Sequence, residues 1–196
     1  MKKSTLTQTI LITSGVVLLL AGIQCYLNGW EEEAFRVIIR WTARTSALLF
    51  ALAFGASGFQ YFFKNKLSNW LLAYRAHVGL AFGTVHTFHL ISLLWLQYAL
   101  HPVFTLAKTS SLLGGGLAYL FMYLMMLTTF PRFKNTLSPR NWKLLHTIGG
   151  YWIWLIFFRS YFKNVFFRDQ AYFLFALFSV VLIIRLARLF VEKGKR

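Results

Sequence analysis

Long apolar blocks alternate with short polar connections along the whole chain. Six blocks come close to the length of about 20 residues that a helix needs to cross a bilayer. They run roughly over residues 9–27, 41–63, 76–100, 112–130, 144–162 and 171–190. No soluble domain, long linker or internal repeat interrupts this pattern. We therefore predict an all-α integral membrane protein, a single domain over residues 1–196 that folds as a six-transmembrane-helix bundle.

The charged residues predict the orientation of this bundle. Only 13% of the residues are charged, against about 25% in soluble domains, yet the net charge is +16. With six crossings, the side that holds both termini carries Lys2, Lys3, Lys64, Lys66, Arg75, Arg132, Lys134, Arg140, Lys143, Arg185, Arg188, Lys193, Lys195 and Arg196. The positive-inside rule then makes both termini cytoplasmic. This placement favours anionic lipid headgroups, and not nucleic acid, as the partner of the charge.

The first block resembles a signal peptide, because MKKSTLTQTILITSGVVLLLAG has a basic start and an apolar centre. No small-x-small cleavage pattern follows it, and Gln24 before Cys25 fits a lipoprotein site poorly. We therefore expect an uncleaved first span. Cys25 is the single cysteine, so no disulfide can form within the chain.

Histidines are the main ionisable residues within the predicted spans, whose interiors contain no Asp or Glu. His77, His86 and His89 lie in the third block and His146 in the fifth. Ionisable groups within a membrane are costly and are functional candidates by default. Neutral imidazoles from two helices can bind the iron of one heme between them. The hypothesis is a histidine-ligated cofactor.

A structural role for these histidines is the alternative. Their rings would then bond across helices to hydroxyls such as those of Thr84, Thr87 and Ser92. The glycines of the same blocks allow two interpretations as well. Gly79 and Gly83 form a GxxxG step, which is common where membrane helices pack closely. The same missing side chains would also make room for a flat macrocycle.

Helical geometry divides the histidines. At a rise of about 1.5 Å per residue, His77 and His146 lie about 4.5 Å and about 6 Å from the cytoplasmic ends of their helices. His86, His89 and Arg159 lie deeper, at about 18, about 22 and about 25 Å. At about 100° per residue, His86 and His89 share a face, and His77 points about 180° from His86.

Three segments carry a resemblance to a known family. They are RWTARTSALLF, RAHVGLAFGTVHTFHLISL and NWKLLHTIGGYWIWLIFF, within residues 40–162. With the six-block layout, they resemble the ferric reductase-like transmembrane domain superfamily, nearest to the heme-binding membrane subunit of the bacterial periplasmic methionine-sulfoxide reductase system. The resemblance implies a bundle in the bacterial inner membrane that holds heme b between the third and fifth spans and transfers electrons.

The resemblance also implies ligand positions. The family's glycine with a heme histidine ten residues later matches Gly79 and His89. Its fifth-span histidine, which follows a Trp-x-x-Leu start, matches His146. Its second fifth-span histidine falls on Arg159, and a charged guanidinium cannot bind iron.

Three ligand arrangements remain open. His77 and His146 bind one heme, or His89 or His86 binds an outer heme with an unidentified second ligand or none, or a tilted helix pairs His86 or His89 with His146. We rank His146 and His89 first, then His77, then His86. The guanidinium groups of Arg40, Arg44 and Arg75 would neutralise heme propionates, or would anchor the span ends at headgroups.

The predicted function is that of an electron-transfer subunit with one heme b or two. No GxGxxG after a strand pattern and no P-loop occurs, so we expect no flavin or NAD site in this chain. Electrons would come from quinol or a separate flavoprotein and pass to a partner protein or small acceptor. If it takes part in an enzyme, the chain would be an oxidoreductase component and not a self-contained enzyme. The main alternative is a heme-free membrane scaffold, and a small-solute channel or transporter is a weaker one.

Overall fold

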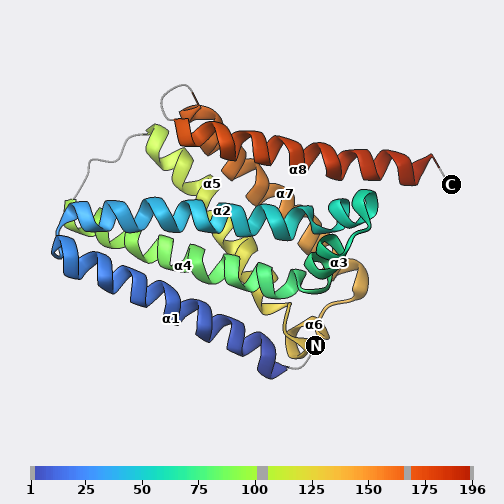
Figure 1. Ribbon diagram of the computed structural model, residues 1–196, viewed down its shortest axis with the longest axis horizontal. Helices are drawn as coiled ribbons and strands as arrows, with labels where there is room; N and C mark the ends of the chain where they lie inside the picture. Colours follow the sequence, from blue (N-terminus) through green and yellow to red (C-terminus); the bar gives the residue numbers. More distant parts are fainter. Residues whose placement is uncertain (1–2, 101–105, 166–168, 195–196) are drawn as a thin grey trace.

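The computed structural model describes residues 3–100, 106–165 and 169–194 as an all-helical protein (Figure 1). Helix accounts for 91% of the residues, and this part of the chain contains no strand. Each of the six apolar blocks corresponds to one long helix: α1 (Lys3–Asn28), α2 (Glu32–Phe63), α4 (Arg75–Leu100), α5 (Leu106–Leu127), α7 (Pro139–Asn164) and α8 (Asp169–Lys193). The fourth block was predicted to reach residue 130, but α5 ends at Leu127. Two short helices, α3 (Lys66–Ala73) and α6 (Pro131–Lys134), lie in the connections.

Four of the long helices, α1, α2, α4 and α8, are long and apolar enough to cross a membrane. The apolar part of α5 that the structure describes, Leu113–Leu127, is shorter. Basic residues reduce the apolar character of α7, which contains Arg140, Lys143, Arg159 and Lys163. The structure therefore indicates an integral membrane protein, and the count of six spans stays a prediction for α5 and α7.

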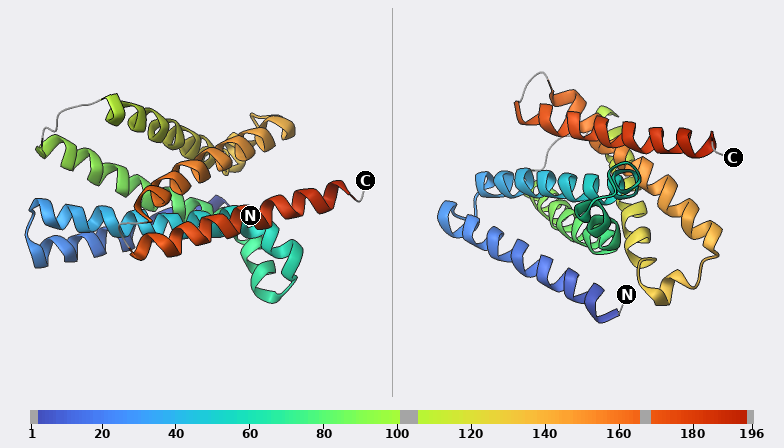
Figure 2. Two further views of the ribbon diagram at one scale, coloured as in Figure 1. Left: turned by 90° about the horizontal axis from the view of Figure 1, so that it is seen from above. Right: turned by 45° about the vertical axis from the view of Figure 1, so that its right-hand side comes forward.

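The chain ends and the short helices α3 and α6 lie towards one end of the bundle, at the right in Figure 1. The views in Figure 2 show the same arrangement. Local caps make these connections compact. Lys64 ends α2 in the left-handed conformation at φ 38°. Asn65 and Ser68 then cap α3, because the Asn65 side chain accepts from the Ser68 N–H at 2.8 Å and the Asn65 N–H donates to Ser68 Oγ. Ser138 caps α7 by accepting from the Asn141 N–H.

Helix α2 lies at the centre and packs against α1, α4 and α8. Helix α7 packs against both α5 and α8. Aromatic side chains fill the core between these helices. The ring of Phe50 on α2 lies with its centroid 5.2 Å from that of Phe82 on α4, 5.6 Å from Phe157 on α7 and 6.0 Å from Phe178 on α8. This aromatic cluster brings α2, α4, α7 and α8 together in the core.

Helix α8 approaches α2 closely at Gly58. A Cβ added there would lie 2.7 Å from Ile184 Cγ2, so the close approach requires a residue without a side chain. One turn away, an Arg185 N–H donates to the carbonyl oxygen of Phe54 at 2.7 Å. The guanidinium also lies over the Phe54 ring, 4.1 Å from its centroid. These contacts hold a cation inside the bundle, at the end where the termini lie.

Candidate cofactor site

The two deeper histidines of α4 face α2. His86 Nδ1 lies 2.9 Å from Ser46 Oγ, and His89 Nδ1 lies 3.2 Å from Thr42 Oγ1 and 3.1 Å from the Ile39 carbonyl oxygen. Their rings lie 5.1 Å apart at 17°. The prediction that His86 and His89 share a face of their helix is confirmed. The groups in contact with the Nδ1 atom of each ring all belong to α2.

His77 points to a different neighbour. Its Nδ1 lies 2.7 Å from Thr9 Oγ1 on α1, and its ring lies 5.8 Å from that of Tyr74. This agrees with the opposite direction that helical geometry gives His77 relative to His86. His146, which lies at a similar predicted depth, contacts α5 instead, so the structure does not bring these two histidines together.

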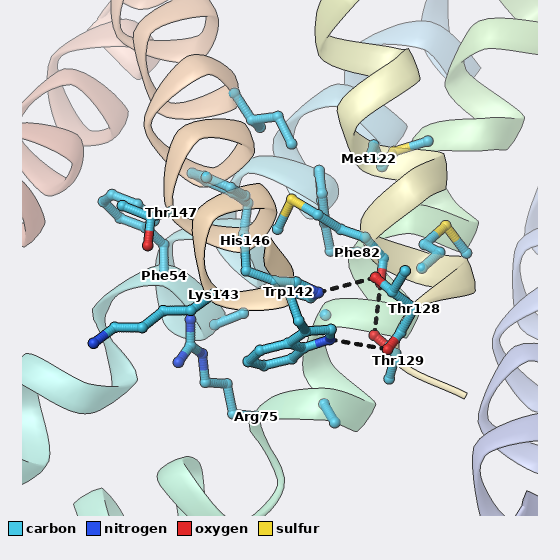
Figure 3. A pocket seen from close by; sticks show the side chains of 18 of the residues that line it. Phe54, Arg75, Phe82, Met122, Thr128, Thr129, Trp142, Lys143, His146 and Thr147 are labelled. Atoms are coloured by element: carbon cyan, nitrogen blue, oxygen red, sulfur yellow. Dashed lines mark hydrogen bonds between the residues drawn. The ribbon is translucent and has the colours of Figure 1, made fainter. Parts of the chain in front are cut away.

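His146 lies at the start of α7, against the end of α5. Its Nε2 lies 3.1 Å from Thr128 Oγ1, and the Thr128 hydroxyl also lies 2.7 Å from the Leu124 carbonyl oxygen, to which it can donate. One turn earlier, Trp142 stacks on His146 with ring centroids 4.1 Å apart and donates to the carbonyl oxygen of Thr128 at 3.1 Å. Figure 3 shows both rings reaching Thr128. These contacts fix the direction of the His146 ring.

His146 lines a cavity of about 830 Å³ that helices α1, α2, α4, α5, α7 and α8 all border. Cavities of roughly 300–1,000 Å³ suit small organic ligands and cofactors. Three cationic side chains line it, those of Arg75, Lys143 and Arg185, and none of its lining residues in the described part of the chain is acidic. Most of the remaining lining is apolar or aromatic, as at Phe54 and Phe82 (Figure 3). The cavity therefore suits a large apolar molecule that carries negative charge.

Glycines in the histidine-bearing helices differ in the space around them. A Cβ added at Gly79 would have no atom within 4 Å, and Gly79 lines the cavity. At Gly83, by contrast, an added Cβ would clash with Met126 of α5, and at Gly149 it would lie 2.8 Å from Met125 Sδ. The Gly79 position thus contributes open space, while Gly83 and Gly149 allow close packing against α5.

The other predicted residues lie at different places. Arg75 lines the cavity, whereas Arg44 of α2 is half-buried and is not among the lining residues. Arg40 and Arg159 are exposed, and Arg159 does not face His89. His101, at the outer end of the third block, lies outside the described residues.

The alternative prediction that the histidines bond to the hydroxyls of Thr84, Thr87 and Ser92 was wrong about these partners. Thr84, Thr87 and Ser92 each donate to a carbonyl oxygen four residues earlier in α4, at 2.8–2.9 Å. A hydroxyl on the same helix as the histidines is closer to its own backbone than to a ring that points outward. The actual partners, Thr9, Thr42, Ser46 and Thr128, come from α1, α2 and the end of α5.

Sequence reasoning missed four residues of this site: Thr128, Trp142 as a stacking partner, Lys143 as a cavity cation, and Arg185. Two signals could have found some of them. Trp142 and His146 are four residues apart, which places them on one helix face. Arg185 interrupts an apolar block, and a cation inside a span is a functional candidate in its own right.

Comparison with protein-family models, with curated proteins and with solved structures finds no match for this chain.

Proposed function

We propose that this chain is a heme-binding electron-transfer subunit of the membrane. The observation that carries the proposal is the cavity of about 830 Å³ in which one imidazole, that of His146, meets three cations and an apolar lining. The proposal includes six membrane-spanning helices with both termini cytoplasmic, in a bacterial inner membrane. The cavity would then open at the cytoplasmic end, where the basic residues gather.

The residues around the cavity fit heme b. An apolar lining suits the flat macrocycle, and the open space at Gly79 adds to the room for it. Arg75, Lys143 and Arg185 suit the two propionates, because guanidinium and ammonium groups bind carboxylates through charge-assisted hydrogen bonds. His146 is the histidine among the lining residues, so the donor set fits a heme with one histidine ligand and not a pair of histidines.

A bound heme would supply one-electron chemistry, and the chain would supply position and polarity. The contacts of His146 with Thr128 and Trp142 would orient the ligand ring. The aromatic cluster around Phe50 and Phe82 would exclude water from the inner side of the cavity. Electrons would arrive from quinol or a separate flavoprotein and leave to a partner or small acceptor, because no predicted motif of this chain binds flavin or NAD.

A heme-free membrane scaffold is the second candidate. One observation favours it: each histidine of the described residues, namely His77, His86, His89 and His146, has a hydroxyl partner outside its own helix. Such bonds are what purely structural histidines in a membrane bundle need.

Absorption spectra distinguish the two candidates. The full chain is expressed with adequate heme supply, purified in detergent, and measured in its oxidised and dithionite-reduced forms. We expect a Soret band that shifts on reduction and a sharp α band in the reduced form. A protein that is folded by circular dichroism but has no Soret band would support the scaffold and contradict the proposed function.

A further inference from the structure

The short helix α3 connects two long apolar helices at the end of the bundle where the termini lie (Figure 1). Lys64 and Asn65 separate it from α2, and Tyr74 alone separates it from α4. Both α2 and α4 are long and apolar enough to cross a membrane. A connection this short between two such helices lies at the membrane surface. In the left view of Figure 2, this connection projects sideways from the bundle.

One side of α3 is held by the bundle. Ser68 and Leu71 are only 5% and 8% exposed. On the same helix, Asn69 Oδ1 accepts a hydrogen bond from Gln60 Nε2 of α2 at 3.3 Å. With the capping box at its start, these contacts fix the rotation of α3 about its own axis, and so they determine which side faces away from the bundle.

The side that faces away is apolar and aromatic. Leu67 is 71% exposed, Trp70 53% and Tyr74 47%. Spacings of three and four residues place these side chains on one face, and the rings of Trp70 and Tyr74 lie 5.2 Å apart between centroids. We call these three residues the α3 stripe. Three large side chains that are this exposed require an environment other than water to become buried.

The chemistry around the α3 stripe matches the boundary between lipid and water. Trp and Tyr are enriched at this boundary, where one end of the ring is apolar and the other wet. Lys64 and Lys66 lie beside the stripe and are exposed, and residues 60–75 include no Asp or Glu. Helices that lie in the plane of a membrane surface combine basic residues with Trp and Leu in this way, and anionic headgroups attract the basic residues.

We propose that α3 is an interfacial anchor, whose stripe is buried among the lipid acyl chains directly below the headgroups. Helices α2 and α4 hold both of its ends at the surface, so the contact with lipid is effectively intramolecular and an eight-residue helix suffices. Leu72 and Ala73 of the same helix line the cavity that contains His146. The anchor therefore holds one wall of this cavity at the depth of the headgroups, whether or not the cavity binds heme.

A nitroxide spin label at Leu67 tests the anchor. Cys25 is the single cysteine, so the label is attached to Leu67→Cys in a Cys25→Ser chain, which is reconstituted into vesicles of phosphatidylethanolamine and phosphatidylglycerol. Electron paramagnetic resonance then compares collisions of the label with oxygen, which concentrates among acyl chains, and with a neutral nickel chelate, which stays in water. We expect oxygen collisions to dominate at Leu67.

Asn69→Cys in the same background is the matched control. Asn69 is also exposed and lies on the same helix, but about 200° around it from Leu67. Its ratio of oxygen to nickel collisions should be severalfold lower, and circular dichroism checks that both variants are folded. Equal ratios at the two positions, or a Leu67 label that collides mainly with the nickel chelate, would overturn the anchor. The latter result would leave the stripe facing water, as a surface for another protein.

The fluorescence of Trp70 provides a second measurement without a label. The emission of Trp70 is the difference between the unsubstituted chain and Trp70→Phe, each in the same vesicles. Lipids brominated on the acyl carbons nearest the headgroup quench a tryptophan that touches them. We expect this difference to be largely lost in brominated vesicles. A Trp70 emission that the brominated lipids leave unchanged would contradict the proposed position of α3.

Discussion

Replacing His146 by alanine is expected to abolish heme binding in the cavity. Among the lining residues of the described chain, His146 alone offers an imidazole nitrogen, and the cations and apolar walls would remain without an iron ligand. The loss should be at least tenfold in heme per chain, measured by extraction into alkaline pyridine after purification. A tenfold loss corresponds to about 1.4 kcal/mol of binding free energy, a modest demand for a bond to iron.

His77→Ala is the matched control, because His77 is also half-buried and lies near the same end of the bundle, yet it bonds to Thr9 of α1. This variant should keep the heme content of the unsubstituted chain. Heme content unchanged by His146→Ala, or lost equally in both variants, would contradict the ligand role of His146.

Replacing Gly79 by leucine is expected to block heme uptake without destabilising the fold. An added Cβ at Gly79 meets no atom within 4 Å, so the larger side chain would extend into the cavity and occupy space that the macrocycle needs. Hemin titration of the purified variant should show at least a tenfold weaker affinity. The thermal unfolding midpoint of the heme-free protein should stay close to that of the unsubstituted chain.

Gly115→Leu is the control for this variant. Gly115 of α5 is also half-buried with no atom within 4 Å of an added Cβ, but it does not line the cavity. Its hemin affinity should be unchanged. Equal affinity in Gly79→Leu and Gly115→Leu would show that the space at Gly79 is not used by heme.

The helices of this fold could be predicted from the sequence because apolar blocks of this length have few alternatives. Five of the six blocks lie within one long helix each, and the fourth block extends only three residues beyond the end of α5. The short helices α3 and α6 were missed. The Asn65–Ser68 capping box starts α3, whereas α6 is one turn that begins at Pro131 and has no side-chain cap. A search for long apolar blocks detects neither helix.

The directions of the histidines could also be predicted, but not their partners. The helical repeat separates His77 from His86 and His89, and the structure agrees. The repeat says nothing of which helix lies opposite each face, so the contact of α2 with His89 could not be foreseen. The predicted depths of His89 and Arg159 along their helices were also similar, but the side chain of Arg159 is exposed, so depth did not identify the partner of His89.

The cavity depends on tertiary packing. Arg75 was a candidate from its position at the start of a span, but Arg185 joins it only because α8 crosses α2 near Gly58 and Phe54. No periodicity within one helix contains that information. The ferric reductase-like resemblance remains a hypothesis that heme binding would support.

The heme content of the purified chain tests the proposed function most directly. The chain is expressed with adequate heme supply, purified in detergent, and its heme b is quantified against protein by pyridine extraction. We expect at least one heme b per chain in the unsubstituted protein. A folded chain that carries only traces of heme would contradict the proposed cofactor and, with it, the electron-transfer function.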